Sequence, residues 1–198
     1  EQVQAVVDTP ISIDTNKLAI LKEAIKVCKR PPLINSTTCS KEKLDPFIEI
    51  AAAHQASMIG LAMDENSSPK EASKRVEFAG LIAAAWMEAG LPMERLFLDP
   101  IVMPVKFMQD QGKEFLEAAR QFQMFSDPPP NISCGLSNIA SKATEKKLIN
   151  RTFLVMAIAA GVNAVICDVL DVELINAAKT AELLMNREIY ADAYLQKS

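Results

Sequence analysis

The sequence is poor in the residues that hold metal ions. Among its 198 residues it has a single histidine, His54, and four cysteines, none of which forms a Cys-x-x-Cys pair. Zinc sites use clustered cysteine and histidine ligands, and no ordered cluster of carboxylates takes their place here. We therefore predict that this chain binds no metal. Unpaired cysteines are typical of the reducing cytoplasm, which is the location we expect.

The sequence also lacks positive charge in excess, long apolar runs and a secretory signal. A net charge of -4 gives no basic footprint for nucleic acid or for an anionic membrane surface. Leu81–Met87 and Phe153–Val162 are the longest apolar stretches, and both are too short to span a bilayer. Glu1–Thr9 has neither a basic start nor an apolar centre. We expect neither nucleic acid nor membrane as a partner.

Six short apolar runs dominate what is present, and each ends at a polar residue. In chain order these end residues are Asp14, Asn35, Asp64, Asp99, the pair Ser137-Asn138, and Asp168. The predicted strands are Pro10–Asp14, Leu33–Asn35, Ser57–Met63, Leu96–Leu98, Asn131–Leu136 and Asn163–Cys167. A stretch with helical spacing follows each of them, so the chain is predicted to repeat a strand–helix unit.

The helical stretches have recognisable ends. We predict helices over 17–28, 41–54, 69–89, 112–125, 150–160 and 171–185, with helical spacing also at 1–7 and 188–195. The acidic and basic residues of Lys70–Glu77 predict a solvated helix face. Arg151, close to a helix start, is predicted to pair with a neighbouring carboxylate.

Alternating strands and helices fit either an open doubly wound sheet or a closed barrel. No Gly-x-Gly-x-x-Gly follows any strand, so the dinucleotide-binding form of the open sheet lacks its signature. A (β/α)8 barrel has eight units and about 250 residues, whereas we count six units. We predict an α/β fold of the TIM-barrel class, with residues 1–198 as a single domain that lacks the first two units.

The carboxyl ends of parallel strands gather on one face, where ligands bind. Asp14, Asn35, Asp99 and Asn138 would therefore surround one mouth. Asn offers a donor and an acceptor, while an ionised Asp only accepts, so the set suits a flat heterocycle with N–H, amino and carbonyl edges. Any one of these residues, considered alone, could instead be a helix cap or a turn former. For Asp64 and Asp168 we predict that structural role and no part in the site.

Two local features add to this set. Pro100 restricts Asp99 to an extended backbone, so the Asp99 side chain is expected to point from the rim of the barrel. Gly135 lies before Ser137-Asn138, where a residue without a β-carbon permits close approach of a ligand or a strand.

Six short sequence segments resemble those of one protein family in their order and spacing. They are Ser12-Ile13-Asp14-Thr15-Asn16, Ile34-Asn35-Ser36-Thr37, Ile59-Gly60-Leu61, Leu98-Asp99-Pro100, Gly135-Leu136-Ser137-Asn138 and Ile149-Asn150-Arg151-Thr152-Phe153. The chain resembles, from Ser12 to about Tyr190, the methyltetrahydrofolate:corrinoid protein methyltransferases, which are pterin-binding barrel enzymes.

The resemblance implies a homodimer that binds methyltetrahydrofolate in the barrel mouth. It implies transfer of the N5 methyl group to the Co(I) of a cobalamin-type corrinoid carried by a separate corrinoid protein, or the reverse. Asp14, Asn35, Asp99 and Ser137 would bind the pterin, and Asn138 would bind it near N5. Asn138 and Asp99 would be the catalytic residues, and no metal would be bound by this chain itself.

Two alternatives remain. A dihydropteroate synthase shares the barrel and the pterin pocket, but the resemblance to that family would require a strand-tip Lys and a Ser-x-Arg pair after Val162, where the chain reads Val165-Ile166-Cys167-Asp168-Val169. The other alternative is a pterin-binding or corrinoid-docking subunit that performs no chemistry.

Overall fold

A sheet of six parallel strands, ordered as in the chain, forms the centre of the fold. The computed structural model describes residues 2–65 and 68–189. The strands are β1 (Ser12–Asp14), β2 (Leu33–Thr37), β3 (Ser57–Leu61), β4 (Leu96–Asp99), β5 (Asn131–Gly135) and β6 (Ala164–Ile166). Each pairs in parallel with the next, in the order β1-β2-β3-β4-β5-β6.

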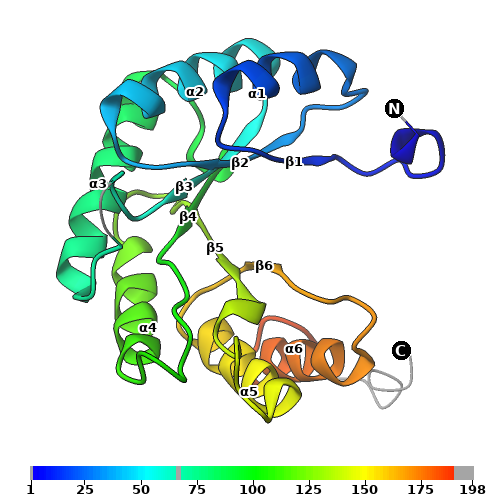
Figure 1. The fold of residues 1–198 in the computed structure, drawn as a ribbon, viewed down its shortest axis with the longest axis vertical. Coiled ribbons are helices and arrows are strands. Elements are labelled where there is room, and N and C mark those ends of the chain that lie inside the picture. Colours follow the sequence, from blue (N-terminus) through cyan, green and yellow to red (C-terminus); the bar gives the residue numbers. More distant parts are fainter. Residues whose placement is uncertain (1, 66–67, 190–198) are drawn as a thin grey trace.

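This strand order decides between the two predicted architectures. A doubly wound sheet reverses its strand order at a switch point, whereas a barrel adds strands in one direction. The order found here never reverses, and the sheet curves into a C-shaped part of a barrel (Figure 1). The predicted fold class is therefore confirmed.

Helices cover the convex side of the curved sheet (Figure 1). They are α1 (Leu18–Ala24), α2 (Lys41–His54), α3 (Ala72–Glu88), α4 (Gln111–Phe122), α5 (Lys146–Ala159) and α6 (Val172–Leu184). Short 3-10 helices are η1 (Val3–Ala5), η2 (Ile25–Val27), η3 (Met93–Arg95) and η4 (Leu136–Asn138). Helix α5 begins four residues earlier than predicted, and most of the helical stretch predicted at 188–195 lies outside the described residues.

The two faces of the sheet differ in what they contact. Ile13, Ile34, Met58 and Leu96 are register partners, and all four are buried in the main apolar core. A β-carbon on Gly60 would lie 2.7 Å from Cγ2 of Ile82 in α3. Gly60 is two residues after Met58 in β3, so both point to the side of the sheet that faces the helices. Because side chains alternate along a strand, the residues between them point to the concave side.

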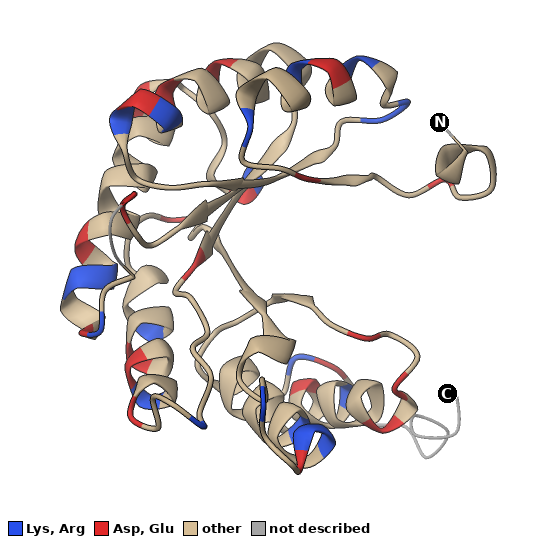
Figure 2. Cartoon of the chain, in the orientation of Figure 1, with Lys and Arg blue, Asp and Glu red and all other residues tan. Residues whose placement is uncertain are grey.

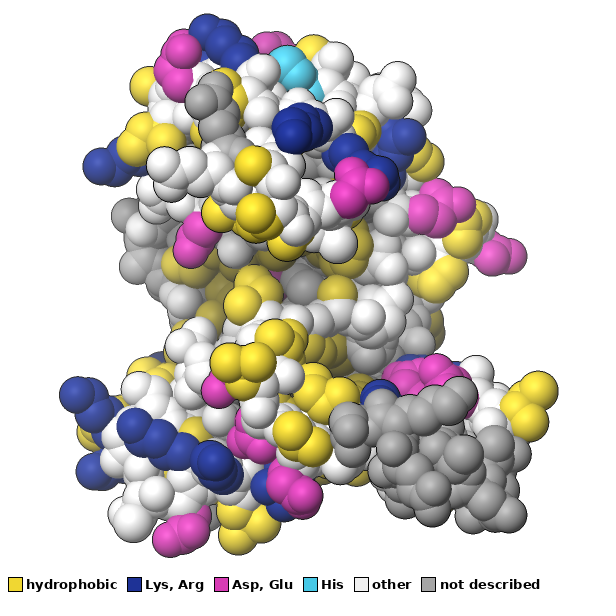
Figure 3. Space-filling view, turned by 90° about the vertical axis from the view of Figure 1, so that its right-hand side faces the viewer, with side chains coloured by type: hydrophobic (Ala, Val, Ile, Leu, Met, Phe, Trp, Pro, Cys, Tyr) yellow, Lys and Arg dark blue, Asp and Glu magenta, His cyan; other side chains and the backbone are white. Residues whose placement is uncertain are grey.

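The concave side is hollow and largely uncharged. Figure 3 shows a hollow between the two lobes of the molecule, lined by many hydrophobic side chains. Lys, Arg, Asp and Glu lie mainly on the outer helices and loops, while the strand ribbons carry few charges (Figure 2). A charged side chain on the concave face is therefore conspicuous, and Asp14 and Asp99 are two such residues.

Candidate pterin-binding site

Asp99, at the end of β4, is the most buried of the predicted site residues. Its side chain is almost enclosed, with 8% of the residue exposed. Oδ1 accepts a hydrogen bond of 2.7 Å from the backbone N–H of Ile101, which holds the carboxylate from the turn after β4. The backbone N–H of Gly135 in the neighbouring strand also favours the charged form and lowers the pKa of Asp99.

Burial changes the acidity of this group. Loss of hydration raises the pKa of the Asp99 carboxyl to about 7, against the lowering effects of the Ile101 and Gly135 N–H groups and of the Arg75 charge. A carboxyl with a pKa near the working pH exchanges readily between acceptor and donor forms. Perturbed pKa values of this kind gather at functional sites.

Asp14, at the end of β1, lies beside Asn35 in β2, which continues for two residues beyond Asn35 to Thr37. They are register partners, and both line a cavity of about 380 Å³ at these strand ends. The other lining residues are Thr15, Asn16, Lys17, Ile20 and Ser36. Asp14 is exposed and Asn35 is half-buried, so both side chains are available to a ligand.

Ser137 and Asn138 follow β5 in η4, and both are exposed. The amide nitrogen of Asn138 lies 3.5 Å from the point where a β-carbon of Gly135 would stand. The Asn138 side chain thus folds back over the strand end, beside the backbone N–H that lowers the pKa of Asp99. The close approach of a ligand or a strand to Gly135 stays a prediction, because a β-carbon there would meet Asn138 at an ordinary contact distance.

The structure places the predicted residues in two groups at one edge. Asp14 and Asn35 belong to β1 and β2, and Asp99, Ser137 and Asn138 belong to β4 and the end of β5. The strand β3 separates the groups, with Leu61 as the register partner of Asp99. Asp14, Asp99, Ser137 and Asn138 lie at or just after the carboxyl ends of parallel strands, as the barrel prediction required, whereas Asn35 lies within β2, level with Asp14.

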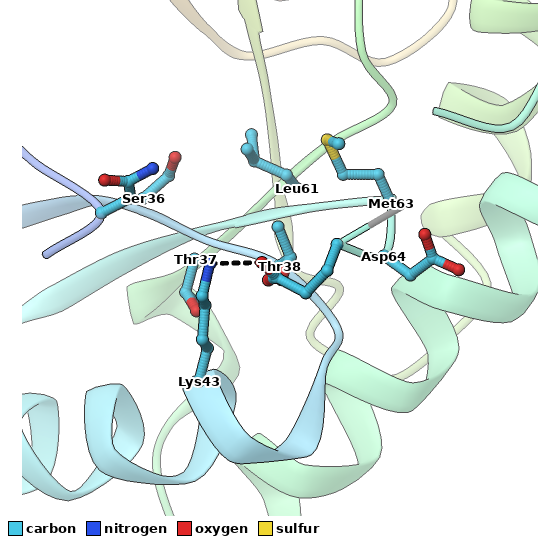
Figure 4. A pocket seen from close by; sticks show the side chains of 9 residues that line it. Ser36, Thr37, Thr38, Lys43, Leu61, Met63 and Asp64 are labelled. Atoms are coloured by element: carbon cyan, nitrogen blue, oxygen red, sulfur yellow. Dashed lines mark hydrogen bonds and ion pairs between the residues drawn. The ribbon is translucent and has the colours of Figure 1, made fainter. Parts of the chain in front are cut away.

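A second cavity, of about 340 Å³, adjoins the first and was not predicted from the sequence (Figure 4). The two share Asn16 and Ser36. In the second cavity Lys43 forms an ion pair with Glu65, and the Thr38 hydroxyl donates to the same carboxylate at 2.5 Å. These two contacts lower the pKa of Glu65. The hydroxyl of Thr37, 2% exposed, has no hydrogen-bond partner within the described residues.

Arg75 and Gln111 were also missed. The predicted solvated face at Lys70–Glu77 is wrong for Arg75, which is fully buried, as is nearly all of Gln111. The Arg75 guanidinium donates to the Gln111 side-chain oxygen at 2.5 Å. The sequence did contain a signal for the burial of Arg75, because Ala72, Phe78 and Ala79 are apolar and share a helical face with it.

Arg151 and Asp168 were predicted to have structural roles. Arg151 pairs with Glu173 at 3.4 Å, as predicted, and Asp168 accepts from the Leu170 N–H at 3.0 Å as a turn former. Residues 2–65 and 68–189 contain no group of three or more histidine, cysteine or acidic side chains suited to a metal ion. Across the same residues no helix is both long and apolar enough to cross a membrane.

Comparison with known proteins gives the family. The model of the family described as "Pterin binding enzyme" matches residues 1–168. The methylcorrinoid:tetrahydrofolate methyltransferase of Eubacterium limosum is 25% identical over 190 residues, covering 94% of this chain and 69% of that protein. Methionine synthase of Mycobacterium tuberculosis is 24% identical over 169 residues, covering 79% of this chain but 14% of that enzyme.

Solved structures share the fold at low identity. A dihydropteroate synthetase with a bound product superposes with a TM-score of 0.69 at 16% identity, covering 93% of this chain and 71% of that one. The dihydropteroate synthase of Clostridium difficile, in the presence of pteroic acid, gives a TM-score of 0.65 at 21% identity, with 92% and 70% covered. These likenesses establish the barrel fold, while the family match and the methyltransferase relative confirm the resemblance inferred from the six segments. The chain belongs to the pterin binding enzyme family.

Proposed function

We propose that this protein moves the N5 methyl group between methyltetrahydrofolate and the cobalt of a corrinoid held by a separate protein. The observation that carries the proposal is the arrangement at the ends of β4 and β5. There the buried Asp99 carboxyl, with a pKa of about 7, lies beside Gly135, and the Asn138 amide folds over Gly135. A homodimer in the reducing cytoplasm is part of the same proposal, and size measurement in solution tests the dimer.

The side chains at the mouth fit the edges of a pterin ring. Such a ring presents N–H and amino donors next to carbonyl and ring-nitrogen acceptors. Asp14 and Asp99 supply acceptors when ionised, and Asn35 and Asn138 supply a donor and an acceptor each. The hollow concave face gives the flat ring an apolar surface to lie against (Figure 3).

Methyl transfer needs help at N5. When the carbon–nitrogen bond breaks, its electron pair stays on N5, and an unassisted nitrogen would leave as an anion. A proton or a hydrogen bond at N5 turns it into a neutral amine leaving group. The corrinoid supplies the cobalt centre that takes up or releases the methyl group.

Asn138 and Asp99 would divide this work. In the proposed complex the Asn138 amide reaches N5 and changes between donor and acceptor as the nitrogen gains its proton. Asp99 binds a ring donor and stabilises positive charge that develops on the pterin. No Ser, Cys or His nucleophile is required, which agrees with the exposed position of His54 at the end of α2.

The dihydropteroate synthase alternative has less support. The solved synthases show a similar fold at 16% and 21% identity, and β6 with its following residues, Ala164–Val169, contains neither a Lys nor a Ser-x-Arg pair. The methyltransferase relative covers more of this chain at higher identity than the dihydropteroate synthetase with product.

Two measurements test the proposal. The wild type is expected to bind methyltetrahydrofolate in calorimetry and to methylate a Co(I) corrinoid protein, followed by the visible spectrum. Asn138→Ala is expected to retain most of the affinity and to lose about 100-fold or more in the transfer rate. Thr144→Ala, an exposed change in the same loop, is the control and should transfer at the wild-type rate. An unchanged transfer rate in Asn138→Ala would remove Asn138 from the catalytic residues, whereas binding without transfer by the wild type would leave only a binding subunit.

A further inference from the structure

Arg75 is a fully buried charge that the proposed chemistry does not use. It lies in α3, and its guanidinium donates three hydrogen bonds to uncharged oxygens. Nε contacts the Pro69 carbonyl at 3.1 Å, Nη1 the Ile101 carbonyl at 3.2 Å and Nη2 the Gln111 side chain at 2.5 Å. One side chain thereby ties the loop before α3, the turn after β4 and the start of α4.

Ile101 connects this buried charge to Asp99. Its carbonyl accepts from Arg75, while its N–H donates to Asp99 Oδ1 at 2.7 Å. Its φ of 70° lies in the left-handed region, which β-branched residues avoid. The turn therefore needs stabilising contacts, and Ile101 has two: its carbonyl accepts from Arg75, and its N–H donates to Asp99.

We propose that Arg75 is a positioning residue, which fixes the Asp99-Pro100-Ile101 turn so that the Asp99 carboxylate is presented to the pterin ring. The inference rests on the proposed function, because it assigns Arg75 a role in the same binding site. Arg75 itself is not among the proposed pterin contacts, since its guanidinium is fully buried and donates to the Pro69, Ile101 and Gln111 oxygens.

The charges around the two residues give the inference an electrostatic consequence. The acidic side chains that act on Arg75 are, in decreasing order, Glu114, Asp99, Asp110 and Glu71. The groups around Asp99 are the Arg75 guanidinium from α3, the Cys134 thiol from β5, and the N–H groups of Ile101 and Gly135. Arg75 lowers the pKa of Asp99, so removal of its charge raises that pKa further and leaves more of the carboxyl protonated at neutral pH.

Three variants separate positioning from simple packing. Arg75→Met removes the positive charge and the three hydrogen bonds. Arg75→Lys keeps the charge but loses the planar guanidinium, whose N–H donors point in fixed directions. Gln111→Met is the matched control, because it removes one buried hydrogen bond of the same cluster and leaves the charge in place. Two readouts are followed across about pH 5.5 to 9. They are the affinity for methyltetrahydrofolate and the carboxyl carbon NMR signal of Asp99 in the ligand-free protein, assigned with Asp99→Asn.

The expected results differ for each variant. Arg75→Met moves the Asp99 titration midpoint upward by about one pH unit, and the affinity midpoint moves with it. Gln111→Met lowers the melting temperature but leaves the midpoint in place. Arg75→Lys keeps the midpoint near that of the wild type while weakening binding at every pH, and it carries the test if Arg75→Met does not fold.

Other outcomes overturn the inference. An Asp99 midpoint that is the same in Arg75→Met as in the wild type would make Arg75 a packing residue only, and so would wild-type affinity in Arg75→Lys. Because the NMR titration needs no ligand, failure of this inference is distinguishable from failure of the proposed function. In the latter case the wild type itself would bind no methyltetrahydrofolate.

Discussion

The amide nitrogen of Asn138 lies 3.5 Å from the position that a β-carbon of Gly135 would take. Gly135 has a φ of -82°, which any residue can adopt, so its backbone does not require glycine. Its N–H also lowers the pKa of the Asp99 carboxyl. A side chain at position 135 would therefore reduce the space between Asn138 and β5, where we place the pterin.

Gly135→Ala is expected to leave stability nearly unchanged and to impair binding. The added methyl group would meet Asn138 at an ordinary contact distance, so we expect a change in unfolding free energy of about 1 kcal/mol or less. Affinity for methyltetrahydrofolate, measured by calorimetry, should fall about tenfold, because the methyl group would occupy space beside Asn138 that we assign to the pterin ring.

Gly60→Ala is the matched control on the opposite face. Its β-carbon would lie 2.7 Å from Ile82, so overpacking should cost about 1–3 kcal/mol in denaturant unfolding. Wild-type affinity in Gly135→Ala would show that the ligand does not use the space beside Asn138.

Asp99→Asn should change how stability depends on pH. The folded-state pKa of about 7 lies above the ordinary value of 3.8, so the folded protein holds this proton more tightly than the unfolded chain. The stabilising effect of the proton is complete below about pH 4 and is lost as the pH rises through about 7. A shift of about three units sets an upper bound of about 4 kcal/mol, and we expect about 2 kcal/mol.

Urea unfolding of the wild type and Asp99→Asn at several pH values between about 4 and 8 measures this effect. The variant should be the more stable protein at pH 8, and the advantage should vanish toward pH 4. Two curves that run parallel over this range would mean that Asp99 titrates normally in the folded state.

Asp14→Asn should weaken binding without affecting the fold. The side chain is exposed at the end of β1, and exposed substitutions typically change stability by about 0.5 kcal/mol or less. Loss of an ionised acceptor for a ring donor should lower the affinity for methyltetrahydrofolate by about tenfold. Asp45→Asn, an exposed change on α2, should bind like the wild type. Equal affinities in the two variants would remove Asp14 from the site.

Thr37→Val should be neutral or slightly stabilising. The buried Thr37 hydroxyl has no hydrogen-bond partner within the described residues, so an isosteric methyl group should raise the unfolding free energy by about 0.5 kcal/mol. Thr38→Val is the comparison, because that hydroxyl donates to Glu65 and its loss should be destabilising. A larger loss in thermal unfolding for Thr37→Val than for Thr38→Val would reveal a partner for the Thr37 hydroxyl.

Several parts of the site depend on contacts between distant segments. The register of β2 and β3 shifts between Asn35 and Thr37, and this irregularity makes Thr37 the partner of Gly60 on the helix-facing side. A sequence period of two residues cannot predict such a shift, because it is set by how two strands pair. The cavity lined by Ser36, Thr37 and Lys43 was missed for this reason.

The sequence by itself determined the alternation of strands and helices and the polar ends of β1 and β4 at Asp14 and Asp99, because hydrophobic period and end residues are local signals. Only the tertiary structure decided that Arg75 is buried, that Ile101 joins it to Asp99, and that the pKa of Asp99 rises to about 7. The burial of a charge depends on which remote segments cover it, and those segments come together only when the sheet curves and the helices pack against it.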